Sequence, residues 1–265
     1  MEKLFILGPC SIESAKNYMD SYKFLRPLME GREWLFKASF DKANRTSING
    51  GRGPGLEESL DIFRELKNQF PNVKLTTDVH EPWQVERISE VIDVVQIPAF
   101  LCRQTDLIVE SAKFFDKVNI KKGQWLGPSN LVLSVDKVRD TNPDAEVWLM
   151  ERGTAFGYHR LVVDFDIVDR IKQHYDKYIL DCTHSTQRSR EVYGMQGRPE
   201  VAERFMLASS IFHYDGVFVE THLNPCEAVS DGDCQINMRR IEGLLNKYDS
   251  IVNCLEGWEE GNLKK

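Results

Sequence analysis

The 265-residue sequence lacks several features that would place it in a membrane, secreted or nucleic-acid-binding class. No apolar run approaches the roughly 20 residues that a membrane-spanning helix requires. The opening residues, MEKLFILGPC, are interrupted too early to form the apolar core of a signal peptide, so we expect no secretion signal. Basic residues are not in excess, because the formal net charge is −7, whereas nucleic-acid-binding proteins are usually basic. We therefore expect no membrane and no nucleic-acid partner, and any anionic ligand must be held by a local basic pocket.

Paired cysteine motifs are also missing. The six cysteines are Cys10, Cys102, Cys182, Cys226, Cys234 and Cys254. They form no Cys-x-x-Cys pair, and their spacing suggests no disulfide framework. The sequence therefore predicts a reduced, cytoplasmic protein in which most cysteines are small buried residues.

Short apolar runs recur along the chain, with helix-like segments between them. The eight runs of strand length are Leu4–Leu7, Trp34–Phe36, Val73–Thr76, Val91–Ile97, Val118–Ile120, Val147–Met150, Tyr178–Leu180 and Val217–Val219. The helix-like segments are Leu56–Phe70 and Met238–Leu255, which are the clearest, and Trp83–Ser89, Leu107–Phe115, Phe165–His174 and Glu200–His213. This alternation predicts parallel β-α-β units. Eight such repeats in about 250 residues predict an α/β fold, a (β/α)8 TIM barrel that forms a single domain over residues 1–265.

A doubly wound open sheet is the alternative architecture. It usually carries a Gly-x-Gly-x-x-Gly turn after the first strand, and Gly8-Pro9-Cys10 does not match that turn. Polar residues follow every apolar run, which favours the barrel, because the carboxyl ends of all its strands share one face. These residues include Cys10, Lys37, Ser39, Asp78, His80, Gln96, Lys121, Lys122, Glu151, Arg152, Asp181, His184, Glu220 and His222.

The stretch Phe36–Gly55, FKASFDKANRTSINGGRGPG, is the most chemically dense part of the chain. It combines cationic side chains and small hydroxyls with a glycine-rich end, and it directly follows a strand-like run. Such a loop can hold a phosphate or a carboxylate. A solvated surface loop is the alternative reading.

Two groups of strand-end residues suggest different chemistry. The cationic group consists of Lys37, Lys42, Arg45, Lys122 and Arg152. It exceeds what one phosphate needs, so we expect two anionic ligands or one ligand with two anionic groups.

The second group consists of Cys10, His184, Glu220, His222 and Asp231. Thiolate, imidazole and carboxylate together can bind a divalent transition metal. The spacing matches no zinc-finger pattern, so a buried structural cysteine and a hydrogen-bonded structural histidine remain open, as does a nucleophilic role for Cys10.

Ordered motifs from about Leu7 to Leu245 resemble the 3-deoxy-D-manno-octulosonate 8-phosphate synthase family. The motifs are GPCSIES (Gly8–Ser14), FKASFDKANRTS (Phe36–Ser47), RGPG (Arg52–Gly55), TDVHE (Thr77–Glu81), QIPAFLCRQTDL (Gln96–Leu107), NIKKGQW (Asn119–Trp125), ERGTAFGYHRLVVD (Glu151–Asp164), DCTHSTQ (Asp181–Gln187), DGVFVETHLNP (Asp215–Pro225) and SDG (Ser230–Gly232). The resemblance implies a barrel enzyme of lipopolysaccharide (KDO) biosynthesis. It would condense phosphoenolpyruvate with D-arabinose 5-phosphate to give 3-deoxy-D-manno-octulosonate 8-phosphate and phosphate.

The resemblance also implies roles for individual residues. The phosphoenolpyruvate site would comprise Lys37, Ser39, Lys42, Gln96, Lys122 and Arg152. The aldose phosphate site would comprise Asn44, Arg45 and Thr46, with Asp78 also lining the substrate site. The residues expected to act in catalysis are Lys37, Lys42, Asn44, His184 and Asp231. Arg103 would cross a subunit interface of a homotetramer, so that one active site needs two chains.

The family has a metal-dependent class, with Cys at the position of Cys10, and a metal-free class, with Asn there. The resemblance therefore implies four metal ligands, Cys10, His184, Glu220 and Asp231. His222 would lie near the metal without binding it. Zn²⁺ or Fe²⁺ suits this donor set best, and Mn²⁺ or Co²⁺ remains possible. The polar loop between Asp181 and Glu200 is a candidate mobile lid, although its YGMQGRPE sequence and the additional acid Asp233 depart from the family pattern.

Three other functions are weighed against this one. The sister enzyme 3-deoxy-D-arabino-heptulosonate 7-phosphate synthase, which uses erythrose 4-phosphate, typically has Lys-Pro-Arg where this chain has Lys42-Ala43-Asn44-Arg45. Asn44 therefore favours the five-carbon aldose. A sialic-acid-type synthase normally carries an additional C-terminal domain. A non-catalytic phosphosugar-binding barrel would not need the cationic and metal-binding residues together.

Overall fold

Eight parallel strands close into a barrel in the computed structural model, which describes residues 3–45 and 48–262. The barrel strands are β1 (Leu4–Gly8), β2 (Trp34–Lys37), β3 (Leu75–Asp78), β4 (Val94–Ile97), β5 (Lys117–Lys121), β6 (Glu146–Glu151), β9 (Lys177–Asp181) and β10 (Gly216–His222). They pair in this order, and β1 closes the ring against β10, with Leu4 opposite Gly216 and Gly8 opposite Glu220. The predicted (β/α)8 fold is confirmed.

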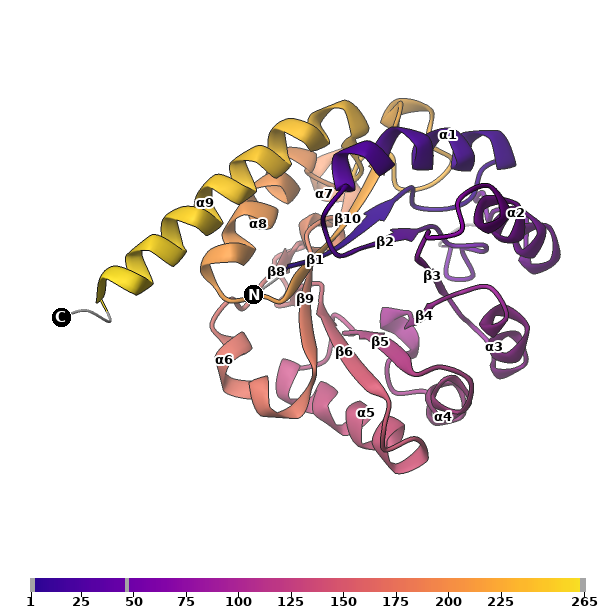
Figure 1. The fold of residues 1–265 in the computed structure, drawn as a ribbon, viewed down its shortest axis with the longest axis horizontal. Helices are drawn as coiled ribbons and strands as arrows, with labels where there is room; N and C mark the ends of the chain where they lie inside the picture. The colour runs from indigo at the N-terminus through magenta and orange to yellow at the C-terminus, as the bar shows by residue number, and fades with distance from the viewer. Residues whose placement is uncertain (1–2, 46–47, 263–265) are drawn as a thin grey trace.

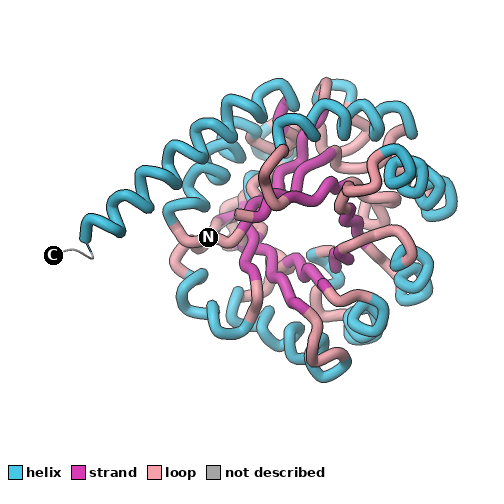
Figure 2. Tube along the Cα trace, viewed as in Figure 1, coloured by secondary structure: helices cyan, strands magenta, loops and turns pink. Residues whose placement is uncertain are grey.

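Helices surround the strands, as Figures 1 and 2 show. They are α1 (Ala15–Leu25), α2 (Leu56–Gln69), α3 (Pro82–Ser89), α4 (Thr105–Phe114), α5 (Pro128–Thr141), α6 (Ile167–Ile171), α7 (Arg190–Tyr193), α8 (Pro199–Ile211) and α9 (Ile241–Asn262). Three short strands lie outside the ring: β7 (Thr154–Ala155), β8 (Leu161–Val162) and β11 (Ile236–Asn237). Helix α9 runs past α8 and continues away from the barrel (Figure 1). Within the described ranges, no helix is long and apolar enough to cross a membrane.

The two faces of each strand bury different parts of the core. In β1, Phe5 and Leu7 belong to the large outer cluster between strands and helices, whereas Leu4 and Ile6 belong to a smaller cluster inside the ring. This alternation follows from the two-residue repeat of a strand, whose successive side chains point to opposite faces. A strand that is buried on both faces must be apolar throughout, which is why the strands appear in the sequence as continuous runs.

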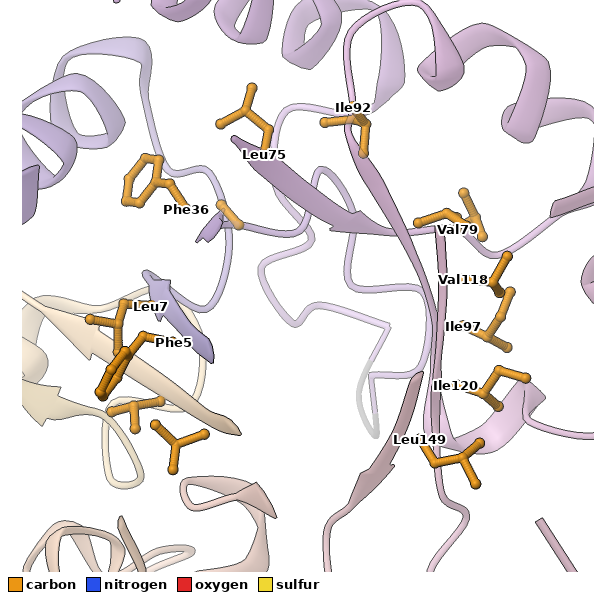
Figure 3. Close-up of a cluster of buried hydrophobic side chains, with 14 of the residues drawn as sticks. Phe5, Leu7, Phe36, Leu75, Val79, Ile92, Ile97, Val118, Ile120 and Leu149 are labelled. Carbon is orange, nitrogen blue, oxygen red and sulfur yellow. The ribbon is translucent and has the colours of Figure 1, made fainter. Parts of the chain in front are cut away.

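The inner cluster fills the barrel interior. Its members are Leu4, Ile6, Leu35, Val94, Trp148, Met150, Ile179 and Phe218. In the outer cluster, Ile97, Val118 and Ile120 project from the neighbouring strands β4 and β5 (Figure 3). Because large apolar side chains fill the interior, polar side chains are left to gather where the strands end.

All eight predicted strands are present, but two begin later than expected. Strand β3 begins at Leu75 rather than Val73, because the Val73 amide is used in a turn and donates to Phe70 O at 3.0 Å. Strand β4 begins at Val94 rather than Val91, because the Val91 amide donates to Ile88 O at 3.0 Å as α3 ends.

Helices α1 and α5, like the short helix α7, were not among the predicted segments. Two of the five buried residues of α1 are aromatic, Tyr18 and Tyr22. Its first turn is capped by Ser14, whose side chain accepts from the Asn17 amide at 3.1 Å. Helix α5 begins with Pro128, a residue that favours the first helical turn. These cap signals could have located both helices. The predicted segment 238–255 is also shifted, since residues 238–240 form a 3-10 turn before α9 begins at Ile241.

We expect Gly8→Ala to destabilise the barrel strongly. A Cβ at Gly8 would lie 1.9 Å from Lys37 O and 2.9 Å from Lys37 C, and the backbone of a central strand cannot move aside. Urea unfolding should show a loss of about 3 kcal/mol or more in the free energy of unfolding. Gly243→Ala is the control, because its Cβ would have no neighbour within 4 Å. A Gly8→Ala protein as stable as the parent would contradict this packing.

Candidate active site

The carboxyl ends of the strands surround a cavity of about 540 Å³. Nine of the predicted site residues line it: Lys37, Lys42, Asn44, Arg45, Asp78, Arg152, His184, Glu220 and Asp231. They come from distant parts of the sequence, and strand closure brings them together. This cavity therefore lies at the predicted barrel mouth.

Lys37 and Glu220 form a buried ion pair at the floor of this cavity. Lys37 Nζ donates to Glu220 Oε1 at 2.9 Å and to Cys10 O at 3.1 Å. Burial alone would raise the pKa of Glu220, but the charges of Lys37, His184 and Lys42 outweigh it and hold that pKa well below its usual value. Glu220 is therefore an anion whose position is set by cations from other strands.

Asp78 binds two further predicted site residues, Ser39 and Gln96. Its carboxylate accepts hydrogen bonds from Ser39 Oγ and from Gln96 Nε2, and Gln96 Oε1 accepts from Asn119 Nδ2 at 3.2 Å. Lys42 Nζ donates to the same Ser39 hydroxyl at 3.0 Å. Burial would raise the pKa of Asp78, but nearby Lys37 and Lys42 lower it well below its ordinary value.

The two cations at the ends of β5 and β6 differ in what they offer a ligand. Lys122 is fully buried, and its ammonium donates to Thr154 Oγ1 at 2.9 Å and to Gly153 O at 3.1 Å. Lys122 is not among the residues that line the cavity, whereas the preceding residue, Lys121, is. Arg152 donates from Nη2 to Gln187 Oε1 at 2.5 Å, and its buried Nε and Nη1 have no hydrogen-bond partner among the described residues.

The free donors of Arg152 have the chemistry to hold an anion. Burial lowers the pKa of Arg152, and the neighbouring carboxylates of Asp181 and Glu151 oppose that shift. A buried guanidinium with unsatisfied donors is costly, and a phosphate or carboxylate ligand would satisfy them in pairs.

Three of the predicted metal ligands lie together beside this cavity. One donor atom each from Cys10, Glu220 and Asp231 lies within 4.8 Å of the others, and Cys10 Sγ is 3.2 Å from Asp231 Oδ2. His184 is not part of this close set, but its Nε2 lies 3.5 Å from Glu220 Oε2. Cys10 follows β1, and His184 lies in the turn after β9. Glu220 belongs to β10, and Asp231 lies in the loop after it.

The chemistry of this cluster fits a divalent cation. Glu220 Oε2 is buried without a hydrogen-bond partner, although the other oxygen of the same carboxylate is satisfied. Burial raises the pKa of the Cys10 thiol strongly, and the charges of Glu220 and Asp231 raise it further. A bound cation would offset the charges of the two carboxylates and favour the thiolate form of Cys10. Asp231 also adopts a left-handed backbone conformation, with φ of 51°, as residues held at functional sites often do.

His222 lies apart from this cluster. Its Nε2 is 3.2 Å from Glu13 Oε2, and its Nδ1 accepts from the Asn224 amide at 3.0 Å. Both ring nitrogens are therefore engaged, and His222 supports the loop beside the cluster.

Of the residues in the loop after β2 that were predicted to bind the aldose phosphate, two are described, and both line the cavity. Asn44 and Arg45 line the cavity, and Arg45 Nε donates to Gly51 O at 2.8 Å while its buried Nη2 has no partner among the described residues. Thr46, assigned to the aldose phosphate, lies outside the described residues. Arg52 is paired with Asp41 through its Nε at 2.7 Å, so the structure gives it a role in holding the loop.

Arg103 does not line the cavity of its own chain. It is exposed after the short turn at Ala99–Leu101, and its carbonyl accepts from Lys137 Nζ at 2.9 Å. Nearby, the exposed rings of Phe100 and Trp125 lie 5.6 Å apart. The contribution of Arg103 to a neighbouring active site stays a prediction.

The predicted lid contributes Gln187 and Gln196 to the cavity wall. Asp233, the acid that departs from the family pattern, holds this segment, because its Oδ2 accepts from Arg190 Nη2 at 2.9 Å and from the Gln196 amide at 3.2 Å. The lid thus has a direct link to the loop that carries Asp231, and its mobility stays a prediction.

The site also contains residues that the sequence assigned to no role. Lys121, Asp181 and His80 are the main ones, and His80 and Lys121 line the cavity. All three follow or end a strand, which was the one available signal. Burial lowers the pKa of His80, so its imidazole is neutral at neutral pH.

Known proteins resemble this chain over nearly its whole length. The profile of the DAHP synthetase I family matches residues 2–253. A 2-dehydro-3-deoxyphosphooctonate aldolase of Campylobacter jejuni (strain 81116) is 44% identical, covering 97% of this chain and 99% of the relative. The protein of the same name from Helicobacter hepaticus is 43% identical, covering 94% and 97%. That from Wolinella succinogenes is 42% identical, covering 92% and 97%.

Proposed function

Because the chain belongs to the DAHP synthetase I family, in the group of 2-dehydro-3-deoxyphosphooctonate aldolases, we propose that it catalyses their reaction. It condenses phosphoenolpyruvate with D-arabinose 5-phosphate and water, and it releases 3-deoxy-D-manno-octulosonate 8-phosphate and inorganic phosphate. The enzyme is a transferase of KDO biosynthesis, the 3-deoxy-8-phosphooctulonate synthase.

One juxtaposition supports this proposal above all. A buried arginine with free donors, Arg152, and a compact Cys10–Glu220–Asp231 cluster line or adjoin the same cavity. The arginine suits the phosphate of phosphoenolpyruvate, and the cluster suits a divalent metal near the reacting aldehyde. Neither feature alone would favour this reaction over simple anion binding.

The chain's own residues position the two reactants. Arg152, Lys37 and Lys42 bind phosphoenolpyruvate, with Ser39 and Gln96 fixed through Asp78. Asn44 and Arg45, which both line the cavity, bind the aldose phosphate. The assignment of Lys122 to phosphoenolpyruvate requires its ammonium to exchange at least one of its present protein partners for the ligand.

Holding the enolpyruvyl carbon beside the aldehyde carbon supplies much of the rate, because the carbon nucleophile is mild. A bond forms between these carbons as the enol double bond is used up, and negative charge develops on the aldehyde oxygen. Water adds to the carbon that bears the phosphate and loses a proton, and the aldehyde oxygen gains one. The C–O bond to the phosphate then breaks, and phosphate leaves. The surrounding cations stabilise this charge.

Cys10, His184, Glu220 and Asp231 hold the metal in this proposal. The ion is Zn²⁺ or Fe²⁺, with Mn²⁺ or Co²⁺ as alternatives that the donor set also tolerates. When bound, it supplies Lewis acidity that orients the aldehyde or activates the water. His184 and Asp231 take part in catalysis through this site.

The proposed enzyme is a cytoplasmic homotetramer in which Arg103 of one subunit completes the site of another. The exposure of Arg103 and of the neighbouring aromatic pair Phe100 and Trp125 supports an interface on this face.

One assay separates the candidate reactions. The metal-loaded protein is incubated with phosphoenolpyruvate and with either D-arabinose 5-phosphate or erythrose 4-phosphate, and release of inorganic phosphate is followed. We expect release chiefly with the five-carbon sugar. Faster release with erythrose 4-phosphate would identify the sister synthase, which the presence of Asn44 argues against. No release with either sugar would favour a non-catalytic phosphosugar-binding barrel.

A further inference from the structure

A second cavity, of about 400 Å³, adjoins the candidate active site. Gln124, Gln187 and Gln196 line both cavities, so the two spaces share a wall. The rest of the lining comes from the hairpin that carries β7 and β8 and from the predicted lid, and it includes Arg160 and Arg188. None of the described residues that line this cavity is acidic, and the proposed reaction gives the cavity no role.

The backbone places Arg160 and Arg188 directly opposite each other, in an isolated antiparallel β-bridge. The Leu161 amide donates to Gln187 O at 3.2 Å on one side of the bridge, and the Ser189 amide donates at 2.7 Å to the carbonyl that precedes Arg160. Residues flanked by such bonds form a non-hydrogen-bonded pair, whose side chains share a face and whose Cα atoms are only about 4.5 Å apart. Both arginine side chains therefore extend from one face of the bridge, at the wall of the second cavity.

Neither arginine has a carboxylate partner in the part of the chain that the structure describes. Arg188 Nε donates to Met195 O at 3.3 Å, and the Arg188 guanidinium lies over the Tyr193 ring at 4.8 Å. These contacts hold the Arg188 guanidinium in place but leave its two terminal nitrogens available to a ligand. Arg160 is exposed to solvent beside it.

The other two arginines of the predicted lid are paired. Arg190 Nη2 lies 2.9 Å from Asp233 Oδ2, and Arg198 Nε lies 3.1 Å from Glu200 Oε1. Carboxylates are thus available to this segment, but they pair with other arginines. Like charges directly opposite each other on paired strands are destabilising, and a bound anion would remove that repulsion at the bridge.

The available donors suit a phosphate. Two planar guanidinium groups can share the three oxygens of a phosphate dianion, whereas a carboxylate has two oxygens and one charge. Ser189 and the three shared glutamines can add neutral donors. A metal cation is disfavoured, because no described carboxylate lines this cavity.

We propose that Arg160 and Arg188 form a second anion site, which binds a phosphate dianion beside the reaction cavity. Gln187 links the two cavities, because it lines both of them and its Oε1 accepts from Arg152 Nη2 at 2.5 Å. The ligand is inorganic phosphate or the phosphate group of a monoester, since both present the same dianion. The site does not depend on the proposed reaction, because neither arginine is assigned to the substrates or the metal.

Equilibrium dialysis of the full chain against labelled inorganic phosphate at low ionic strength tests this site. The Arg160→Gln/Arg188→Gln double variant should bind one phosphate fewer per chain than the parent. The same loss should occur in an Arg152→Met background, which separates the second site from the active site. Each single variant should bind this phosphate roughly 5- to 20-fold more weakly, as expected for the loss of a charge-assisted hydrogen bond at a partly exposed position. An unchanged number of phosphates in the folded double variant would overturn the proposal.

Arg190→Gln/Arg198→Gln is the matched control, because it removes two positive charges from the same segment and leaves the bridged pair intact. It should bind as many phosphates as the parent. If it lost the same phosphate, overall charge and not the bridged pair would attract the anion, and the proposal would be wrong. Thermal unfolding shows whether each variant is folded. Arg160→Lys and Arg188→Lys keep the charge but lose the planar guanidinium, so weaker phosphate binding in them supports the site even if the glutamine double variant does not fold.

Tungstate, a heavy analogue of phosphate, locates the site directly. Its anomalous peak in crystals of the parent should lie between the Arg160 and Arg188 guanidinium groups, and a peak at Arg152 alone would contradict the proposal. Displacement of labelled phosphate from the Arg152→Met protein by phosphoenolpyruvate or D-arabinose 5-phosphate would identify a monoester as the ligand. Displacement by neither would identify inorganic phosphate, whereas equal displacement by pyruvate would rule out a site for phosphate.

Discussion

Complete removal of divalent metal is expected to lower turnover by at least about a hundredfold, and added Zn²⁺ or Fe²⁺ should restore it. The physical reason is that Cys10, Glu220 and Asp231 offer donor atoms within 4.8 Å of one another, and a cation held there would supply the Lewis acidity that the proposed reaction uses. The measurement is phosphate release before and after chelation, with metal content determined by elemental analysis.

Cys10→Ser tests the same site by mutation. It should retain less metal than the parent, whereas Cys226→Ser should not, because Cys226 is exposed and lies outside the cluster. Full turnover in a sample in which elemental analysis finds no metal would contradict a catalytic metal at the Cys10–Glu220–Asp231 cluster.

Arg152→Met should lower kcat/KM for phosphoenolpyruvate by roughly 10²- to 10³-fold, the usual effect of losing a buried group that stabilises developing charge. Arg152 has two buried nitrogens without protein partners, and a ligand phosphate is the natural acceptor for them. The folded state should tolerate the change, since the variant removes a desolvated charge that lacks partners on two nitrogens.

The control for Arg152 is Arg240→Met. Arg240 is an exposed arginine in the 3-10 turn before α9, it pairs with Glu203 of α8, and it is not among the residues that line the cavity. Its kcat/KM should stay within about twofold of the parent. If Arg152→Met kept parent-like kinetics for phosphoenolpyruvate, the phosphate would have to bind elsewhere in the cavity.

The barrel could be predicted from the sequence because its strands are buried on both faces. Leu4–Gly8 and Glu146–Glu151 must be apolar along most of their length, so they stand out from the amphipathic segments around them. Helix α1 could not be found in this way, because its buried face uses Tyr18 and Tyr22 and gives a weak aliphatic repeat.

The sequence predicted where the site lies, but not which of its side chains face the cavity. Lys121 and Lys122 are adjacent and have the same charge, so motif resemblance alone determined which of them was assigned to the ligand. The three-dimensional arrangement separates them, since Lys122 is surrounded by carbonyl oxygens and Lys121 lines the cavity. Similarly, the pairing of His222 with Glu13 joins residues 209 positions apart, and no local pattern encodes it.

The closure of the ring by β1 and β10 has a consequence for synthesis of the chain. The first strand made, Leu4–Gly8, cannot find one of its two neighbours until Gly216–His222 has left the ribosome. Its edge stays open for most of translation, and such unpaired edges invite association with other chains. Cys10 and Asp231 meet across 221 positions at that same closure, so the nascent chain assembles the Cys10–Glu220–Asp231 cluster only after the ring has formed.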